Sequence, residues 1–309
     1  MDGLLVIDKP QGITSHDCVY RARRATKIKQ IGHAGTLDPM ATGVLVLCIG
    51  KATRLSEYLL GEDKTYVGTI KLGERTNTDD AEGEVIETRA VPVISADLLE
   101  QVRQKFLGEI MQVPPQFSAI KKDGQRAYVL ARQGESVELA ARRMTIYEMS
   151  LEWEGGAWNV ERGEMESLHP LPSTLHIHVK CSAGTYIRSL ARDMGEMLGC
   201  GGHLTALRRT QAGSFRLDDA LPLDDIDQWT TRLLPMDRAV SHFPEVNLGE
   251  AQAKDFAMGR FLDAGQLVEQ DATHLAGLCR VYDTKRALIG MGEMQNKLLK
   301  PAKVFAAQS

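Results

Sequence analysis

The sequence lacks the features that mark several common classes of protein. No apolar run is long enough to span a bilayer, and the apolar start, Leu4–Ile7, is too short for a signal peptide. The five cysteines form no Cys-x-x-Cys pair, which favours reduced thiols. No internal repeat, Rossmann glycine pattern or P-loop is present. We therefore expect a cytoplasmic protein with no membrane partner and no cofactor.

Length and composition indicate one large domain and one small one. The chain has 309 residues, of which 43% are hydrophobic, so it can bury a large core. Composition shifts after Pro235-Met236-Asp237, and a compact tail begins at Pro244. We predict a main domain over residues 1–240 and a tail domain over 244–309. A tail of about 65 residues is marginal as a free fold, so we expect it to dock on the main domain.

One loop, residues 31–43, combines three glycines, an imidazole (His33) and a single carboxylate (Asp38). Glycines allow a sharp turn or a close approach to a ligand, and Pro39 biases Asp38 away from helical geometry. Asp38 is therefore an acid presented on a shaped loop, where catalytic groups often lie. The alternative is that Asp38 only caps the next element.

Hydrophobic periodicity predicts strands with helices between them. The predicted strands cover residues 4–7, 43–50, 64–73, 144–153, 175–180 and 201–209. The predicted helices cover about 14–29, 52–60 and 95–108, and a further helix opens within 182–190 and ends near 199. In the tail we predict a helix at 251–258 and strands at 278–282, 287–293 and 297–305. This order indicates a mixed α/β (α+β) fold with a largely antiparallel central sheet, flanking helices and a central cleft, plus a small β-rich tail.

Basic residues gather in three places, although the net charge is −4. The predicted helix at 14–29 carries five of them without an acid between Cys18 and Leu37. A second set lies at 114–143, which we interpret as a mobile arm over a groove. The third is formed by Lys297, Lys300 and Lys303, with no acid after Glu293. Solvated faces are the usual explanation for such runs, but together with the Asp38 loop they favour a phosphate backbone as partner.

The sequence gives only weak evidence for two possible metal sites. His176 and His178 share a strand face, but no third ligand is evident, and neutral strand histidines are commoner. The acidic loop 75–83 lacks the alternating ligands and the distal glutamate of a calcium loop. We therefore predict no metal.

Several motifs, in their chain order, resemble those of TruB-type tRNA pseudouridine synthases. They are Lys9-Pro10 with Gly12, the loop Gly32–Pro39, Lys64-Thr65-Tyr66, the loop Arg75–Gly83, Gly184–Arg188 and Leu207-Arg208-Arg209. The similarity covers nearly the whole chain, including a tail that looks like a small PUA-like RNA-binding domain. Residues 155–173 depart from the compact hairpin expected there.

The resemblance implies a role for each matching residue. Asp38 would be the essential aspartate, Tyr66 the aromatic residue stacked on the target uracil, and Arg188 the partner of the aspartate. The implied substrate-binding residues, besides Tyr66, are Lys9, His33, Asp80, Tyr186 and Leu207. The implied reaction converts a uridine in the tRNA T loop, position 55, to pseudouridine.

The chemistry of this isomerisation agrees with the residues present. The N1–C1′ bond must break, the uracil must rotate, and a C5–C1′ bond must form, with no exchange of electrons. One carboxylate suffices, either attacking C1′ or removing a sugar proton, and the sequence does not choose between these routes. An arginine beside Asp38 would keep its carboxylate ionised. An aromatic side chain would replace the stacking that a base loses when it flips out of the RNA. Tyr66 as plain core, Arg188 paired with Asp193 or Glu196 on the surface, and His33 as a hydrogen-bonded loop residue are the alternatives.

Two other functional classes remain open from the sequence. The chain could be a non-catalytic tRNA-binding or tRNA-folding module, or a dyskerin-like guide-dependent subunit of a larger particle. Intact Asp38, Tyr66 and Arg188 argue against the first, and the basic arm argues against the second. We expect a monomeric enzyme that binds the T-arm of tRNA without an obligatory protein partner.

Overall fold

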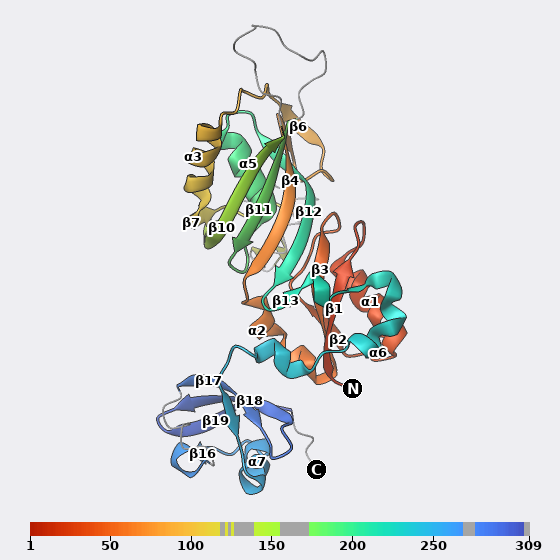
Figure 1. Ribbon diagram of the computed structural model, residues 1–309, viewed down its shortest axis with the longest axis vertical. Coiled ribbons are helices and arrows are strands. Elements are labelled where there is room, and N and C mark those ends of the chain that lie inside the picture. The colour runs from red at the N-terminus through yellow and green to blue at the C-terminus, as the bar shows by residue number, and fades with distance from the viewer. Residues whose placement is uncertain (118–120, 123–124, 127–138, 155–172, 268–275, 306–309) are drawn as a thin grey trace.

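The computed structural model describes residues 1–117, 121–122, 125–126, 139–154, 173–267 and 276–305 (Figure 1). Its main feature is a ten-stranded sheet in which most neighbouring strands are antiparallel. The order is β14 (Leu221–Pro222), β1 (Gly3–Lys9), β3 (Thr42–Ile49), β12 (Gly202–Ala212), β4 (Lys64–Leu72), β11 (Thr174–Cys181), β10 (Arg142–Glu154) and β7 (Gly108–Gln112), with β2 (Ile31–Ala34) on β3 and β13 (Phe215–Arg216) on β12.

The sheet has two halves that meet where β12 crosses to β3. These two strands pair in parallel over only two positions, Arg208 with Thr42 and Arg209 with Gly43. Gly43 has φ +101°, and a Cβ there would lie 2.2 Å from the Arg209 carbonyl oxygen. Glycine is therefore required at this crossing. The Asp38 loop enters β3 at this same junction.

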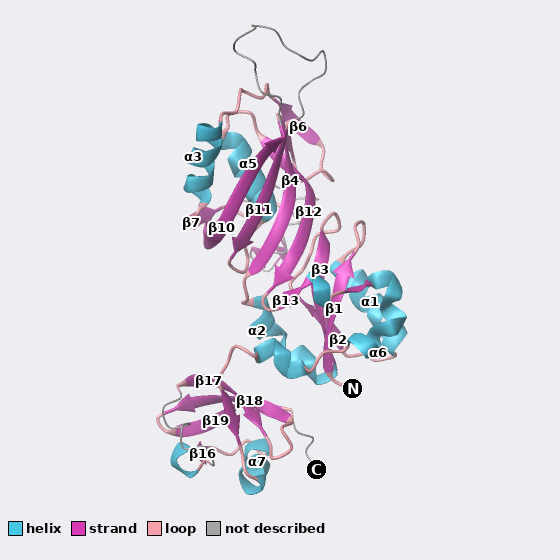
Figure 2. Cartoon of the chain, viewed as in Figure 1, coloured by secondary structure: helices cyan, strands magenta, loops and turns pink. Residues whose placement is uncertain are grey.

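Helices cover parts of the sheet (Figure 2). Apolar residues of α3 (Ala96–Phe106) and α5 (Ile187–Met197) belong to the same core cluster as those of β4, β10, β11 and β12. The other α-helices among the described residues are α1 (Ser15–Thr26), α2 (Ser56–Leu60), α6 (Trp229–Arg232) and α7 (Glu250–Ala257). In the described part of the chain, no helix is long and apolar enough to cross a membrane. The predicted mixed fold with a largely antiparallel sheet is confirmed.

The alternation predicted for residues 64–73 is present in β4. Tyr66, Gly68, Ile70 and Leu72 are buried, whereas the residues between them are more exposed. The buried face is apolar because it packs against the core beneath α5. Tyr66 therefore points into the molecule.

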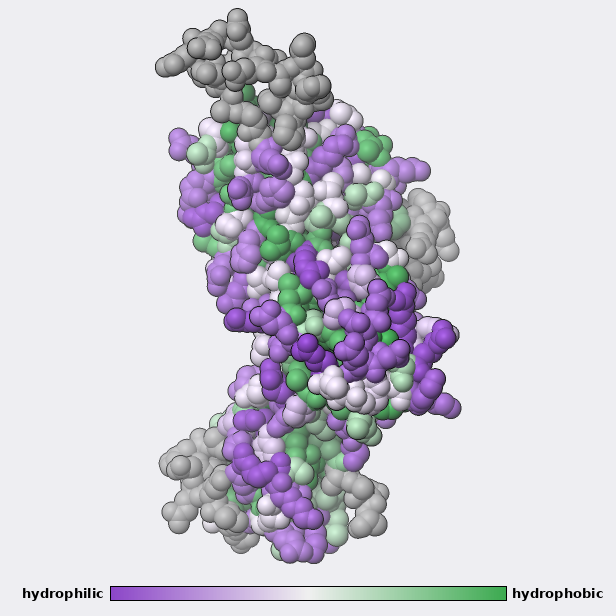
Figure 3. Space-filling view, turned by 45° about the vertical axis from the view of Figure 1, so that its right-hand side comes forward, coloured by the Kyte–Doolittle hydropathy of each residue, from purple (hydrophilic) through white to green (hydrophobic). Residues whose placement is uncertain are grey.

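A second sheet of five strands forms the tail. Its order is β15 (Glu245–Asn247), β17 (Gly277–Tyr282), β18 (Leu288–Gln295), β19 (Leu298–Val304) and β16 (Leu262–Asp263). Its own core includes Phe256, Val281 and Leu299. Figure 3 shows this part as a lobe joined to the larger one by a narrower region.

The tail docks on the main part through apolar contacts, as predicted. Met291 and Phe305 belong to one buried cluster with Ala52 and Leu55 of η1 (Gly50–Leu55), a 3₁₀ helix. Lys303 also contacts the main part, because its ammonium lies 2.8 Å from the Glu57 carboxylate. Lys303, one of the three lysines predicted to contact phosphate, thus has an acidic partner that is remote in sequence.

Several predicted boundaries differ in detail. Helix α1 ends at Thr26 rather than near Lys29, because Lys27 adopts a left-handed conformation (φ 61°) and its N–H bonds to the Arg23 carbonyl. Residues 50–60 form η1 followed by α2 rather than one helix. The loop after β4 contains the hairpin of β5 (Glu74–Thr76) and β6 (Val85–Thr88).

Much of the predicted basic arm at 114–143 lies outside the described residues. Its described part contains the short hairpin of β8 (Lys121–Lys122) and β9 (Gln125–Arg126). Residues 155–173, which depart from the expected compact hairpin, also lie almost entirely outside the described residues.

Candidate active site

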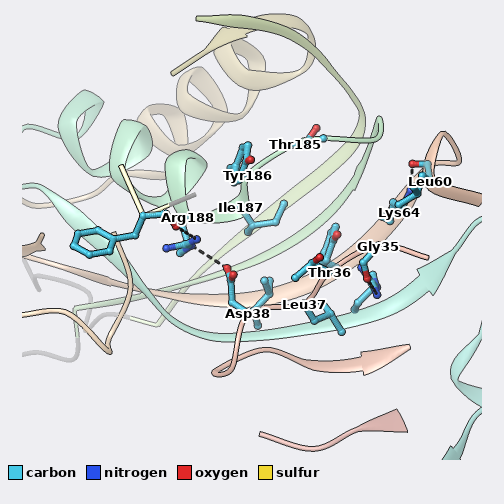
Figure 4. A pocket seen from close by; sticks show the side chains of 15 residues that line it. Gly35, Thr36, Leu37, Asp38, Leu60, Lys64, Thr185, Tyr186, Ile187 and Arg188 are labelled. Atoms are coloured by element: carbon cyan, nitrogen blue, oxygen red, sulfur yellow. Dashed lines mark hydrogen bonds and ion pairs between the residues drawn. The ribbon is translucent and has the colours of Figure 1, made fainter. Parts of the chain in front are cut away.

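A cavity of about 400 Å³ opens between the two halves of the main sheet. Segments that are far apart in sequence line it, and Figure 4 shows their side chains converging. The lining residues are Gly35, Thr36, Leu37, Asp38, Leu60, Lys64, Tyr66, Phe117, Gly184, Thr185, Tyr186, Ile187, Arg188, Leu207 and Arg209. Its volume is in the range of small-molecule pockets.

The loop that carries Asp38 is held from below by buried polar groups. Lys9 is fully buried, and its ammonium donates to the carbonyls of Pro10, Pro39 and Ala41 at 3.0, 3.2 and 2.6 Å. The Ser15 hydroxyl exchanges hydrogen bonds with the backbone of Leu37. These bonds fix the loop on both sides of Asp38. Lys9 does not line the cavity, so this geometry supports the loop and gives no direct contact for a ligand there.

Asp38 and Arg188 form an ion pair at the cavity wall. The Arg188 Nε lies 3.0 Å from the Asp38 carboxylate, and its Nη1 lies 3.1 Å from the Asp80 carboxylate. Nη1 and Nη2 also donate to the carbonyls of Thr78 and Phe117. All three guanidinium nitrogens are therefore engaged.

The three charged residues of this cluster, Arg188, Asp80 and Asp38, differ in solvent exposure. The side chains of Arg188 and Asp80 are 7% and 4% exposed, whereas that of Asp38 is 39% exposed. The carboxylate of Asp38 thus remains accessible from the cavity, and Asp80 holds the arginine from behind. Arg188 as a surface residue was the wrong alternative, because Asp193 pairs with Arg192, and Glu196 pairs with Arg75 and Arg89.

Tyr66 lies in the cavity wall beside two buried cations. Burial raises the pKa of its hydroxyl, and the charge of the Arg209 guanidinium, together with a hydrogen bond from it, opposes that rise. Arg209 is 1% exposed and donates to the carbonyls of Val44 and Gly35 at 2.7 and 3.1 Å. It therefore joins β12 to the start of β3 and to the Asp38 loop.

Lys64, the second cation, closes the C-terminal end of α2. Burial lowers the pKa of its ammonium to about 8, and Nζ donates to the carbonyls of Leu59 and Leu60. Sequence reasoning named neither Lys64 nor Arg209 as a site residue. Period-two alternation was the available signal, because Lys64 precedes Tyr66 by two residues and Arg209 follows Leu207 by two.

Of the remaining residues predicted to bind substrate, two line the cavity and one does not. Tyr186 and Leu207 line the cavity, and Gln112 holds the backbone of Tyr186 through two hydrogen bonds of 2.8 and 3.0 Å. His33 lies on β2, opposite Leu47, and is not part of the cavity lining. Burial lowers its pKa, which favours the neutral ring, and its buried Nδ1 has no hydrogen-bond partner among the described residues.

His176, one of the two histidines considered as metal ligands, is already in contact with other side chains. His176 lies 3.0 Å from the Glu154 carboxylate and 3.4 Å from the Thr69 hydroxyl. Within the described ranges, no group of three or more His, Cys, Asp or Glu side chains could hold a metal ion. The ionisable side chains that line the cavity are one carboxylate (Asp38), two phenols (Tyr66 and Tyr186) and three arginine or lysine side chains.

The fold, this cavity and the family profiles that match the chain together identify a pseudouridylate synthase. Residues 23–187 match the TruB family pseudouridylate synthase N-terminal domain, and 188–241 match the tRNA pseudouridylate synthase B C-terminal domain. Residues 244–305 match the pseudouridine synthase II TruB C-terminal profile. The chain belongs to the TruB family of pseudouridylate synthases.

Relatives cover nearly the whole chain. It is 42% identical to the tRNA pseudouridine synthase B of Burkholderia pseudomallei (strain 668), over 98% of this chain and 97% of that protein. It is 46% identical to the protein of the same name from Arthrobacter sp. (strain FB24), over 86% and 83%. A solved chain from an H/ACA RNP bound to a substrate RNA containing 2′-deoxyuridine superposes with a TM-score of 0.70 at 25% identity, over 99% of this chain and 86% of that one.

Proposed function

We propose that the chain isomerises a uridine of tRNA to pseudouridine, at position 55 of the T loop, as the TruB resemblance implies. The observation that carries the proposal is the accessible Asp38 carboxylate paired with a buried arginine in the cavity wall. Membership of the family and relatives named tRNA pseudouridine synthase B support the substrate class. The cavity volume is adequate for a flipped nucleoside.

Asp38 is the proposed catalytic carboxylate. It either attacks C1′ or removes a sugar proton, and in both routes the N1–C1′ bond breaks and uracil leaves with the bonding electrons. The uracil rotates, C5 bonds to C1′, the carboxylate is regenerated, the C5 proton leaves and N1 takes up a proton. The product is an isomer of the substrate, so neither an oxidant nor a cofactor enters the balance.

The surrounding residues have separate proposed tasks. Tyr66 stacks on the flipped uracil, and we assign the transfer of the C5 proton to its hydroxyl. Arg188 orients Asp38 through the ion pair between its Nε and the carboxylate, which are 3.0 Å apart. Tyr186 and Leu207 bound the base from the sides, and Asp80 acts through Arg188.

We propose that RNA also contacts surfaces outside the cavity. The two-domain division at 1–240 and 244–309, with a PUA-like RNA-binding tail, fits the separate five-stranded sheet. The basic residues of α1 are the proposed phosphate contacts beside the Asp38 loop. We further propose that the chain acts in the cytoplasm as a monomer.

The test is pseudouridine formation by the purified chain on a tRNA transcript. Asp38→Asn should lower the rate by roughly 10⁴-fold, since an amide is neither an effective nucleophile nor a base, while tRNA affinity stays near normal. Asp97→Asn, on the exposed start of α3, is the matched control and should leave the rate unchanged. A transcript with cytidine at position 55 should yield no product.

The same assay separates the other candidate functions. Activity that appears only with an added guide RNA or protein would favour the dyskerin-like alternative. Normal tRNA binding without any turnover by the wild-type chain would favour a non-catalytic RNA-binding module. Ready turnover by Asp38→Asn would contradict the assignment of Asp38.

A further inference from the structure

Helix α5 carries a second arginine, Arg192, one turn beyond Arg188. Residues four apart lie on the same helix face, so both side chains extend toward the same neighbours. On one side lies the acidic loop with Asp79 and Asp80, and on the other lies the chain segment 112–117. Figure 4 shows the Arg188 member of this arrangement from the cavity side.

The two arginines make parallel bridges across the same gap. Arg188 joins the Asp80 carboxylate (3.1 Å) to the Phe117 carbonyl (3.1 Å). Arg192 joins the Asp79 carboxylate (2.8 Å) to the Val113 carbonyl (2.9 Å). Only the first bridge reaches Asp38. The second is also shielded from solvent, with the side chains of Arg192 and Asp79 at 18% and 14% exposure.

The acidic loop is shaped to present two successive carboxylates to α5. Asp79 has a positive φ of 62°, a conformation that is uncommon for residues other than glycine. Its carbonyl accepts from the Leu204 N–H, and the Ala81 N–H donates to the Leu204 carbonyl. Burial raises the pKa of the Asp79 carboxyl, and the Arg192 guanidinium opposes that rise. The strained turn is therefore anchored to β12 by its backbone and to α5 by Arg192.

We propose that Arg192 is a positioning residue for the isomerisation, acting through Arg188. It holds the Asp79–Asp80 turn and the segment 112–117 at a fixed distance from α5, and these two elements supply three of the four contacts of the Arg188 guanidinium. These three contacts orient the guanidinium so that its Nε points at the Asp38 carboxylate, which is the fourth contact. This inference rests on the proposed function.

The second bridge matters for rate because the two elements that Arg192 ties to α5 also hold Arg188 in place. Without Arg192, the Asp79 carboxylate and the Val113 carbonyl lose a shared partner, although Ser189 still donates to Val113 at 2.9 Å. A shift of about 1 Å at the reacting groups is enough to lower a rate by roughly 10²-fold. The effect should therefore appear in the chemical step and not in tRNA affinity.

The test compares Arg192→Met, Arg192→Lys and the control Arg89→Met. Arg89 also ties α5 to a neighbouring hairpin, through Glu87 and Glu196, but it touches neither the acidic turn nor the segment 112–117. For each variant we would measure the single-turnover rate at saturating tRNA, the tRNA dissociation constant and the melting temperature. The wild-type chain must first form pseudouridine, so failure of the proposed function is detected separately.

The expected result is a single-turnover rate roughly 10–10²-fold lower in Arg192→Met, with a dissociation constant within about threefold of the wild-type value. Arg192→Lys keeps the charge and a donor for Asp79, so it should recover part of the rate. Arg89→Met should retain the wild-type rate even where it melts earlier. An Arg192→Met rate equal to wild type at saturating tRNA would overturn the proposal, and so would equal rate losses in Arg192→Met and Arg89→Met.

Discussion

The ion pairs of two regions of this molecule, the cavity wall and the contact between the tail and the main part, differ in burial. In the cavity wall, Arg188 and Asp80 are almost fully buried, and their other hydrogen bonds are made within the protein. Arg188 donates to the backbone carbonyls of Thr78 and Phe117, and the Asp80 carboxylate accepts from the Thr78 hydroxyl and the Glu82 N–H. At the tail contact, Lys303 pairs with Glu57, whose side chain is 62% exposed. There the buried surface is apolar, with Met291 and Phe305 at its centre.

The difference in burial distinguishes charges that fix the geometry of the site from charges that add little to stability. Burying a charge is unfavourable unless its partners are complete, so the cavity cluster is sensitive to loss of any member. A half-exposed pair is screened by water and contributes little to stability. Helix α2 touches both regions, since Lys64 closes one end and Glu57 contacts the tail. Four substitutions test this contrast.

The largest effect is expected for Arg188→Met. It leaves the buried Asp80 carboxylate without its cation, which should cost about 3–5 kcal/mol of unfolding free energy. Asp38 loses its partner as well, so the turnover rate should fall by roughly 10²-fold or more. Chemical denaturation and single-turnover assays would measure the two losses. A rate and a stability close to those of the wild type would show that the cluster does not define the site.

Tyr66→Phe should affect rate much more than stability. The ring remains for stacking, so tRNA affinity should change little, and loss of the buried hydroxyl should cost about 1 kcal/mol. Loss of a proton-transferring group should lower turnover by roughly 10²-fold. Tyr147→Phe, at a half-exposed position outside the cavity, is the control. If both variants turn over normally, Tyr66 is only a core residue.

Lys64→Met should change how stability depends on pH. The pKa of Lys64 is lowered to about 8 by burial, from an ordinary value of 10.5. Between these values the unfolded chain binds more protons than the folded one, so the free energy of unfolding rises with pH. This contribution is complete above pH 10.5 and is lost as pH falls through 8. The melting temperature of the wild type should therefore rise relative to that of Lys64→Met between pH 8 and 10, and a constant difference would contradict the lowered pKa.

The smallest effect is expected for Lys303→Met at the tail contact. The substitution removes a partly exposed ion pair but keeps the length of an apolar side chain, so it should cost less than about 1 kcal/mol. Thermal denaturation would measure this, and the rate at saturating tRNA should not change. A loss as large as that of Arg188→Met would mean that the charges at the two regions are equivalent.

Local patterns were sufficient to predict most of the elements. The period-two alternation of residues 64–73, the buried run at 43–50 and the Ser95 cap of α3 lead to strands and a helix close to those observed. The end of α1 was missed because the left-handed turn at Lys27 has no glycine to signal it.

The sequence by itself determined the candidate residues, because the motifs containing Asp38, Tyr66 and Arg188 are contiguous and ordered. Only the tertiary structure decided which of them converge. It brought Arg188 to Asp38 and Asp80, placed Arg209 and Lys64 in the same wall, and left Lys9 and His33 outside the cavity lining. Likewise it gave Lys303 an acidic partner 246 positions away, at Glu57 (303 − 57). The reason is that burial and ion pairing depend on which segments the sheet places side by side. A pattern along the sequence does not say which remote segments become neighbours in space.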